Sequence, residues 1–241
     1  MDAGARKRSG RRAGSGSPAF QRLVLASRSP RRRFLLRLLD VPFTVRPSGI
    51  PEHRHPGETP RQRAMRLARR KAEVVARRHP SAWVLGCDTI VSHGTRQLGI
   101  PRDRSEAEAM LRLLSGRVHQ VWTGVALAGP LPRTRVLAEC TRVRIAPLTE
   151  AELQAYLDSG EWKGKAGAYA IQGRFAAYVR HLEGSYTNVV GLPLEPVRRL
   201  LRAAGIRNPA RGGAVQAPRR RQRSRGWRAA ATSSSRRTGV R

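Results

Sequence analysis

The sequence has few cysteines, few acidic residues and no long apolar run, and each shortage excludes a class of protein. Its two cysteines, Cys87 and Cys140, lie far apart without a CxxC pattern. That argues against a disulfide framework or a zinc site and predicts ordinary core thiols. No run of about eighteen apolar residues occurs, and the basic N-terminus lacks an apolar signal segment. We therefore expect no membrane span, no secretory signal and a cytoplasmic location.

Acidic residues are heavily outnumbered: 16 Asp and Glu stand against 48 Lys and Arg, a formal net charge of +32. Much of the excess lies in residues 1–19 and 208–241, which are rich in Gly, Ser, Ala, Pro and Arg without apolar periodicity. This composition predicts two disordered basic tails. With no RNA-recognition or helix-turn-helix motif in the chain, we expect the tails to give only nonspecific, salt-sensitive adhesion to nucleic acid.

Between the tails, over residues 20–207, predicted strands and helices alternate without an internal repeat. This alternation indicates one α/β domain with a mixed sheet. Strands are expected at 23–25 and 82–92, the second broken at Gly86, and in a hairpin around Gly129-Pro130. Helices are expected at 61–78 and from Pro193 to Gly205. Two more helices are expected to begin at the capping boxes Ser105/Glu108 and Thr149/Glu152.

The stretch LASRSPRRRFLL, residues 25–36, is the first specific signal. Ser29 suits a helix N-cap and Pro30 the first helical position. The apolar face of this helix is expected to consist of Phe34, Leu35, Leu38 and Leu39. A helix N-terminus disfavours nearby cations unless an anion neutralises them, so Arg31 and Arg32 are poorly placed for helix stability but well placed for a phosphate. The alternative is a solvated arginine run.

Two further residues carry possible chemistry. Asp88 follows the apolar run Trp83–Cys87, where we expect the strand to end, and open α/β sheets bind ligands at such ends. A carboxylate there can hold a divalent cation or accept a proton from water, and the alternative is an Asx-turn. Lys71 falls on the apolar face of its helix, where it either extends its ammonium to the surface or points into a cleft at an anion.

Other patterns are less specific. No Walker A or GxGxxG pattern occurs. His53 and His55 are expected to be solvated loop residues rather than metal ligands. His119 is expected to be a structural hydrogen-bond partner.

Seven collinear segments over about residues 22–204 resemble the Maf family of nucleoside triphosphate pyrophosphatases. They are LASRSPRR, GIPEH, RLARRKA, LGCDTIV, EAEAMLRLLSGRVHQVWTGVAL, KAGAYAIQG and GSYTNVVGLPL. The resemblance implies an elongated mixed sheet flanked by helices, with two lobes around a cleft, similar to the inosine-triphosphate pyrophosphatases. It also implies hydrolysis of a nucleoside triphosphate to the monophosphate and pyrophosphate, aided by a divalent cation (Mg or Mn), and by analogy a homodimer.

The resemblance also implies roles for single residues. Asp88 corresponds to the proton acceptor, and Glu52 and Asp88 correspond to acids that would hold the metal. Substrate-binding roles are implied for Ser27, Arg31, Arg32, Glu52, Lys71, Thr89 and Gln172, of which Arg31, Thr89 and Gln172 match positions associated with base selectivity. The form AIQG, which contains Gln172, resembles the branch acting on dTTP and UTP rather than on 7-methyl-GTP. An amide suits the N3–H and carbonyl edge of uracil or thymine because it both donates and accepts.

One residue departs from the family pattern. Ile100, in QLGIPRD, stands where the family usually has a lysine, and Arg96 and Arg102 are the nearest cations in sequence. A lost charge at a reacting phosphate slows catalysis, by about a hundredfold for a loss on the order of 3 kcal/mol. The alternative function is therefore a catalytically weak or inactive Maf-like nucleotide-binding protein with a regulatory role in cell division.

Overall fold

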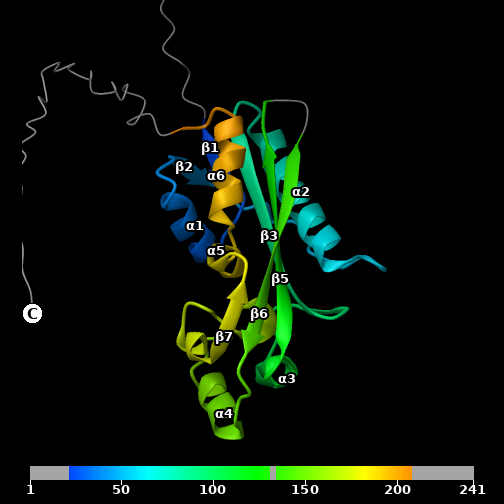
Figure 1. Ribbon diagram of the computed structural model, residues 1–241. Helices are drawn as coiled ribbons and strands as arrows, with labels where there is room; N and C mark the ends of the chain where they lie inside the picture. Colours follow the sequence, from blue (N-terminus) through cyan, green and yellow to red (C-terminus); the bar gives the residue numbers. More distant parts are fainter. Residues whose placement is uncertain (1–21, 131–133, 208–241) are drawn as a thin grey trace, which may run out of the picture.

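A mixed β-sheet forms the centre of the computed structural model, which describes residues 22–130 and 134–207 (Figure 1). Its strands are β1 (Leu23–Leu25), β2 (Phe43–Val45), β3 (Trp83–His93), β4 (Arg96–Leu98), β5 (Val118–Ala128), β6 (Arg135–Ile145) and β7 (Val179–Glu183). They follow the order β2-β1-β3-β5-β6-β7, and β4 pairs with β3. The pairs of β1 with β2 and with β3 are parallel, and the others are antiparallel. The predicted α/β fold with a mixed sheet is confirmed.

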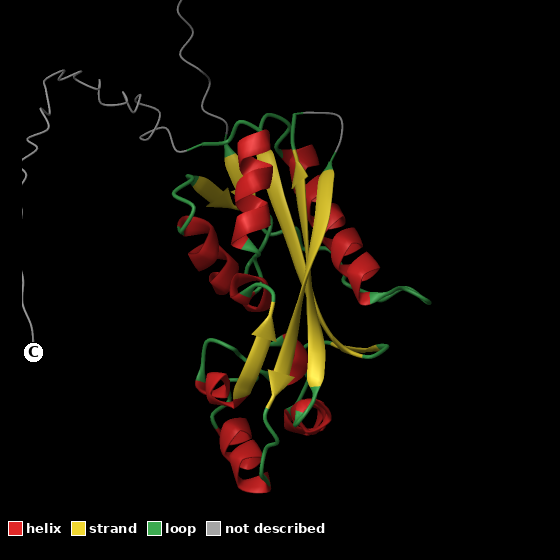
Figure 2. Ribbon diagram, viewed as in Figure 1, coloured by secondary structure: helices red, strands yellow, loops and turns green. Residues whose placement is uncertain are grey.

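The helices cover the sheet at both of its ends. They are α1 (Pro30–Arg37), α2 (Pro60–Arg78), α3 (Arg104–Leu114), α4 (Glu150–Asp158), α5 (Tyr186–Val190) and α6 (Leu194–Ala203), with 3-10 turns η1 (Ala166–Ala168) and η2 (Arg174–Tyr178). Figure 2 shows the long strands crossing from the end that carries α1, α2 and α6 to the end that carries α3 and α4. The two ends are therefore parts of one elongated structure that share a single sheet.

The edge of β3 is interrupted in its middle. The short strand β1 pairs with residues Trp83 to Leu85, and β4 pairs with Val91 to His93. Between these two partners, residues 86–90 pair only along the opposite edge, with β5. This gap gives both faces of the strand access to the same opening.

Gly86 does not break β3, contrary to the sequence expectation, because the strand continues through it. Its role is to let α2 approach the sheet: a Cβ at Gly86 would lie 2.2 Å from the carbonyl oxygen of Ala68 and 2.7 Å from the amide nitrogen of Ala72. Gly124 on β5 meets the same helix, where a Cβ would lie 2.2 Å from the carbonyl oxygen of Ala64. Both glycines therefore set the packing distance between helix and sheet.

Two local predictions are corrected. Helix α1 buries Leu35 and Leu36, while Phe34 and Leu38 are 53% and 55% exposed; in a helix of eight residues, tertiary contact rather than periodicity selects the face. The N-cap of α3 is Asp103, whose carboxylate accepts from the amide of Glu106, so the helix begins ahead of the Ser105/Glu108 box.

Other local predictions are confirmed. The Thr149/Glu152 capping box is present, and β5 and β6 form the antiparallel pair expected around Gly129-Pro130. Both cysteines are free, Cys87 in the core and Cys140 partly buried.

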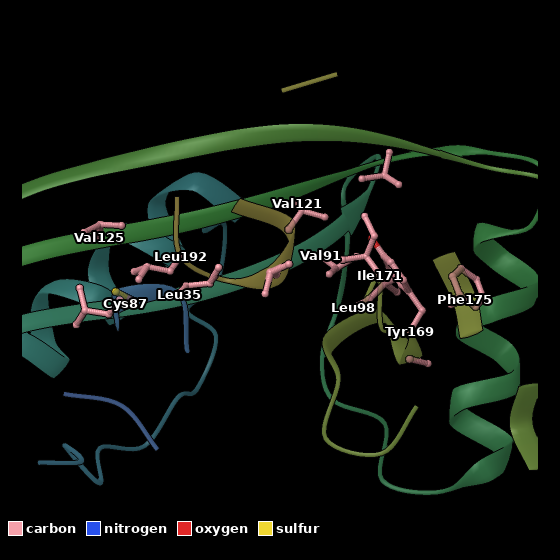
Figure 3. Close-up of a cluster of buried hydrophobic side chains, with 14 of the residues drawn as sticks. Leu35, Cys87, Val91, Leu98, Val121, Val125, Tyr169, Ile171, Phe175 and Leu192 are labelled. Atoms are coloured by element: carbon pink, nitrogen blue, oxygen red, sulfur yellow. The ribbon is translucent and has the colours of Figure 1, made fainter. Parts of the chain in front are cut away.

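The largest core cluster packs along the sheet on the side that carries α1, α5 and the segment around residue 170, and two smaller clusters lie between the sheet and α2. Figure 3 shows Leu35, Cys87 and Leu192 near one end of the cluster, and Tyr169, Ile171 and Phe175 near the other. The sheet thereby ties the two groups of side chains together.

The predicted tails, 1–19 and 208–241, lie outside the described residues, so the predicted disorder stays a prediction. Within 22–130 and 134–207, no helix is both long enough and apolar enough to cross a membrane.

Candidate active site

A cleft of about 870 Å³ opens where the edge of β3 is interrupted. Its lining brings together every site residue expected from the sequence: Ser27, Arg31, Arg32, Glu52, Lys71, Asp88, Thr89 and Gln172. They come from the start of α1, the segment before α2, α2 itself, β3 and the segment after α4. Residues up to 145 positions apart in sequence therefore share one cavity.

The N-terminus of α1 forms one wall of the cleft. As expected, the hydroxyl of Ser29 accepts from the amide of Arg32 at 3.3 Å, and Pro30 takes the first turn. The hydroxyl of Ser27 accepts from the amide of Ser29. This arrangement points the positive end of the helix into the cleft together with Arg31.

Asp88 lies in the middle of β3, not at its end, and this corrects the sequence expectation. It is reachable because β1 stops before it and β4 starts after it. Successive strand residues point to opposite faces, so Asp88 faces α2 while Thr89 faces α1 and α5. An Asx-turn is excluded because the strand continues through Asp88.

The ammonium of Lys71 joins two carboxylates. Its Nζ lies 2.6 Å from Oδ1 of Asp88 and 2.5 Å from Oε1 of Glu52. Asp88 is only 4% exposed, whereas the side chain of Glu52 is 52% exposed. Burial raises the pKa of Asp88, and the charges of Lys71 and Arg32 oppose that rise. Of the two alternatives left open by the sequence, Lys71 therefore takes the one in which it points into a cleft. The anions that it contacts there are carboxylates.

Arg32 holds the cleft walls together. Its Nε donates to the carbonyl of Gly191, Nη1 to the carbonyl of Cys87 and to Ser27 Oγ, and Nη2 to Thr89 Oγ1, at distances of 2.9 to 3.3 Å. Four of its five N–H groups are therefore used by the protein. One N–H remains for a bound molecule.

Arg31 and Lys165 are two cations of the cleft, of which only Arg31 was expected from the sequence. Lys165 lines the same cleft as Arg31, and its ammonium donates to the carbonyl of Lys163 at 3.1 Å. Burial and the charge of Arg31 lower the pKa of Lys165, and burial and the charge of Arg32 lower that of Arg31. In the described part of the chain, the guanidinium of Arg31 forms no hydrogen bond or ion pair. The motif KAGAYAIQG contains Lys165, but only the fold places it near Arg31.

The segment with Gln172 is fixed by a buried hydrogen bond. Nε2 of His119 lies 2.8 Å from the hydroxyl of Tyr169, which confirms the structural role expected for His119. Burial lowers the pKa of His119 to about 4, so its imidazole is neutral near pH 7. Tyr169, Ile171 and Gln172 then line the cleft from this side.

Ile100 also lines the cleft and is 60% exposed. Neither of the two arginines nearest to Ile100 in sequence supplies a charge at this position. Arg102 pairs with Glu106, and Arg96 lies on the antiparallel pair of β4 with β3, outside the cleft lining.

Glu52 and Asp88 are the acids best placed to hold a divalent cation, because they meet at one point within the cleft. Their carboxylate oxygens are the hard ligands that Mg²⁺ and Mn²⁺ prefer. Among the described residues, no group of three or more His, Cys, Asp or Glu side chains could hold a metal, in the cleft or outside it. Two carboxylates fit Mg²⁺, which commonly takes one or two from the protein and the rest from phosphates and water.

Sequence comparisons with known proteins place the chain in one family. The model described as Maf-like protein matches residues 22–204. A dTTP/UTP pyrophosphatase from Myxococcus xanthus is 54% identical over 78% of this chain and 95% of its own length. A second dTTP/UTP pyrophosphatase, from Koribacter versatilis, is 47% identical over 76% of this chain and 95% of its own length. Among solved structures, a HAM1 protein from Coxiella burnetii aligns with 76% of this chain and all of its own, at 17% identity and a TM-score of 0.45.

Proposed function

The chain belongs to the Maf family, and from this premise we propose that it is a nucleoside triphosphate pyrophosphatase that hydrolyses dTTP and UTP to the monophosphate and pyrophosphate. The alignments with two relatives named for that activity cover 95% of each relative's own length. The observation that carries the proposal is the cleft itself, which collects all eight expected site residues.

The triphosphate binds at the start of α1. The guanidinium of Arg31 has no protein partner among the described residues, and Lys165 lines the same cleft. An anion between them removes their mutual repulsion and is also favoured by the positive end of the helix dipole. Ser27 and the remaining N–H of Arg32 complete this wall.

Asp88 accepts the proton of the attacking water. The water oxygen forms a bond to the α-phosphorus while the bond from the α-phosphorus to the bridging oxygen breaks, and pyrophosphate leaves. Burial raises the pKa of Asp88 and so makes it a better base than an exposed carboxylate, while the charge of Lys71 opposes that rise and favours the ionised form. Most of the remaining catalysis is positioning and charge stabilisation.

Glu52 and Asp88 would hold the divalent cation together with the substrate. When bound, Mg²⁺ or Mn²⁺ supplies charge neutralisation at the phosphates. Lys71 contacts Oε1 of Glu52 and Oδ1 of Asp88, so each carboxylate keeps a second oxygen for a cation.

The base binds on the side of Thr89 and Gln172, whose polar groups are uncharged. Ile171, Val189 and Val190 give this part of the lining an apolar surface suited to a planar ring. The amide of Gln172 can donate an N–H to a carbonyl oxygen of uracil or thymine.

A second function, nucleotide binding without useful turnover, is favoured by one observation: Ile100 exposes an apolar side chain in the cleft wall. The test is pyrophosphate release from dTTP, UTP, CTP, GTP and 7-methyl-GTP with Mg²⁺ or Mn²⁺, for the wild type, Asp88→Asn and Ile100→Lys. Turnover of dTTP and UTP by the wild type, lost in Asp88→Asn, supports the pyrophosphatase. A silent wild type with an active Ile100→Lys variant supports the binding protein.

A cytoplasmic location, a homodimer and adhesion of the tails to nucleic acid remain part of this proposal. They rest on composition, on family analogy and on the charge of residues 1–19 and 208–241. Loss of adhesion with unchanged hydrolysis after deletion of residues 208–241 is the expected result.

A further inference from the structure

A chain of hydrogen bonds runs from the cleft into the core through two threonines. Nη2 of Arg32 lies 3.0 Å from Thr89 Oγ1, and Thr89 Oγ1 lies 3.0 Å from Thr123 Oγ1. Thr123 in turn donates to the carbonyl oxygen of Asn188 at 3.1 Å. Thr123 and Asn188 are completely buried, whereas Thr89 lies at the surface of the cleft.

The donors in this chain can be assigned because each hydroxyl has one proton. A carbonyl oxygen only accepts, so the proton of Thr123 is directed at Asn188. Thr123 therefore accepts from Thr89, which places the Thr89 proton toward the core. A guanidinium only donates, so Thr89 accepts from Arg32. The reverse assignment would leave the buried carbonyl of Asn188 without this hydrogen bond, which is costly.

Asn188 is itself held in a fixed position. Its Nδ2 donates to the carbonyl of Val121 at 3.0 Å and to Thr141 Oγ1 at 2.9 Å. Strands β3, β5 and β6 and helix α5 are thereby joined below the cleft, and the orientation of the Thr123 hydroxyl is determined by rigid elements.

Thr89 is left with one lone pair and no proton for a bound molecule. Gly191 leaves room beside this oxygen, because a Cβ at that position would lie only 3.5 Å from Thr89 Oγ1. A molecule that meets this oxygen must therefore bring its own N–H or O–H group.

We propose that Thr123 is a positioning residue for base selectivity: it takes the proton of Thr89 and so presents Thr89 Oγ1 as an acceptor for the N3–H of uracil or thymine. This inference rests on the proposed function. Cytosine carries a lone pair at N3 in place of the N–H, so it meets an oxygen lone pair at the same place and is rejected.

The test compares kcat/KM for UTP and CTP in the wild type, Thr123→Val, Thr123→Ser and Ser92→Ala. The valine at 123 keeps the volume but removes the acceptor, so the Thr89 hydroxyl is free to turn its proton toward N3 of cytosine. The UTP-to-CTP ratio falls about tenfold, the effect of one hydrogen bond of ordinary strength. Serine at 123 keeps the ratio. Ser92 on β3 is the matched control: it is 1% exposed, its hydroxyl has no hydrogen-bond partner among the described residues, and the ratio stays unchanged when it is replaced by alanine.

Three outcomes separate this inference from the proposed function. No hydrolysis of UTP or dTTP by the wild type overturns the proposed function. An active wild type with an unchanged ratio in Thr123→Val, whatever the loss in rate, overturns the role of Thr123. If Thr123→Val does not fold, a substrate comparison with the wild type alone still tests the N3–H contact. The wild type is expected to turn over 3-methyl-UTP, which lacks the N3–H, at least tenfold more slowly than UTP. Equal turnover of the two contradicts the N3–H contact.

Discussion

Replacing Lys71 with methionine tests the charge balance on which the site depends. Methionine keeps the length of the side chain but removes the ammonium that lies 2.6 Å from Asp88 and 2.5 Å from Glu52. Asp88, 4% exposed, is then a buried carboxylate without its counterion. We expect a loss of folding stability together with a loss of activity.

The size of the loss follows from the geometry. At 2.6 Å and an effective dielectric constant of about 20, the attraction between Lys71 and Asp88 is about 6 kcal/mol. Burying the ammonium costs several kcal/mol, which cancels part of this gain. The contact with the half-exposed Glu52 adds less than about 1 kcal/mol. The free energy of unfolding should therefore fall by about 3 kcal/mol, within the range for broken buried pairs.

Urea unfolding at pH 7 with a chelator measures this change without a divalent cation to neutralise the carboxylates. The double variant Lys71→Met/Asp88→Asn is the matched control, because a neutral amide at 88 leaves no uncompensated charge and should recover most of the lost stability. The same urea midpoint for Lys71→Met and the wild type, with equal m-values, would refute this reasoning.

Three further predictions concern other parts of the structure. Because burial lowers the pKa of His119 to about 4, the unfolded chain binds one more proton than the folded chain between pH 6.5 and pH 4. The free energy of unfolding should therefore fall by about 3 kcal/mol over this range, and thermal melts of His119→Gln should lack most of this fall. Lys165→Met should raise the KM for UTP about tenfold or more, as for a lost charge-assisted hydrogen bond, while the exposed control Lys163→Met leaves it unchanged in initial-rate assays. Gly86→Ala should destabilise the chain by more than about 2 kcal/mol in urea because its Cβ meets the backbone of α2, whereas a Cβ at Gly99 has nothing within 4 Å and Gly99→Ala should have little effect.

Local patterns in the sequence predicted the start of α1 well. The N-cap of Ser29 and the first-turn position of Pro30 depend only on neighbouring residues, so a short segment suffices to identify them. The same holds for the capping box at Thr149. The set of residues that lines the cleft followed from the family resemblance, which contains information on contacts between distant segments.

Features that depend on tertiary contacts were not predictable in this way. Asp88 was expected at a strand end, but the opening arises because β1 is short and β4 pairs further along. Gly86 was interpreted as a break because the sequence does not reveal that α2 packs directly on it. The hydrogen bond from Thr123 to Asn188 joins residues 65 positions apart, and no local pattern predicts such a pair.

The most direct test of the account is the position of the oxygen that enters the products. UTP is hydrolysed by the wild type in water enriched in ¹⁸O, and the products are separated and weighed by mass spectrometry, with Asp88→Asn beside it. Attack of water at the α-phosphorus predicts UMP and pyrophosphate in equal amounts, with the ¹⁸O in UMP, and no products from Asp88→Asn. Release of UDP and phosphate, or ¹⁸O in the pyrophosphate, would contradict attack of water at the α-phosphorus.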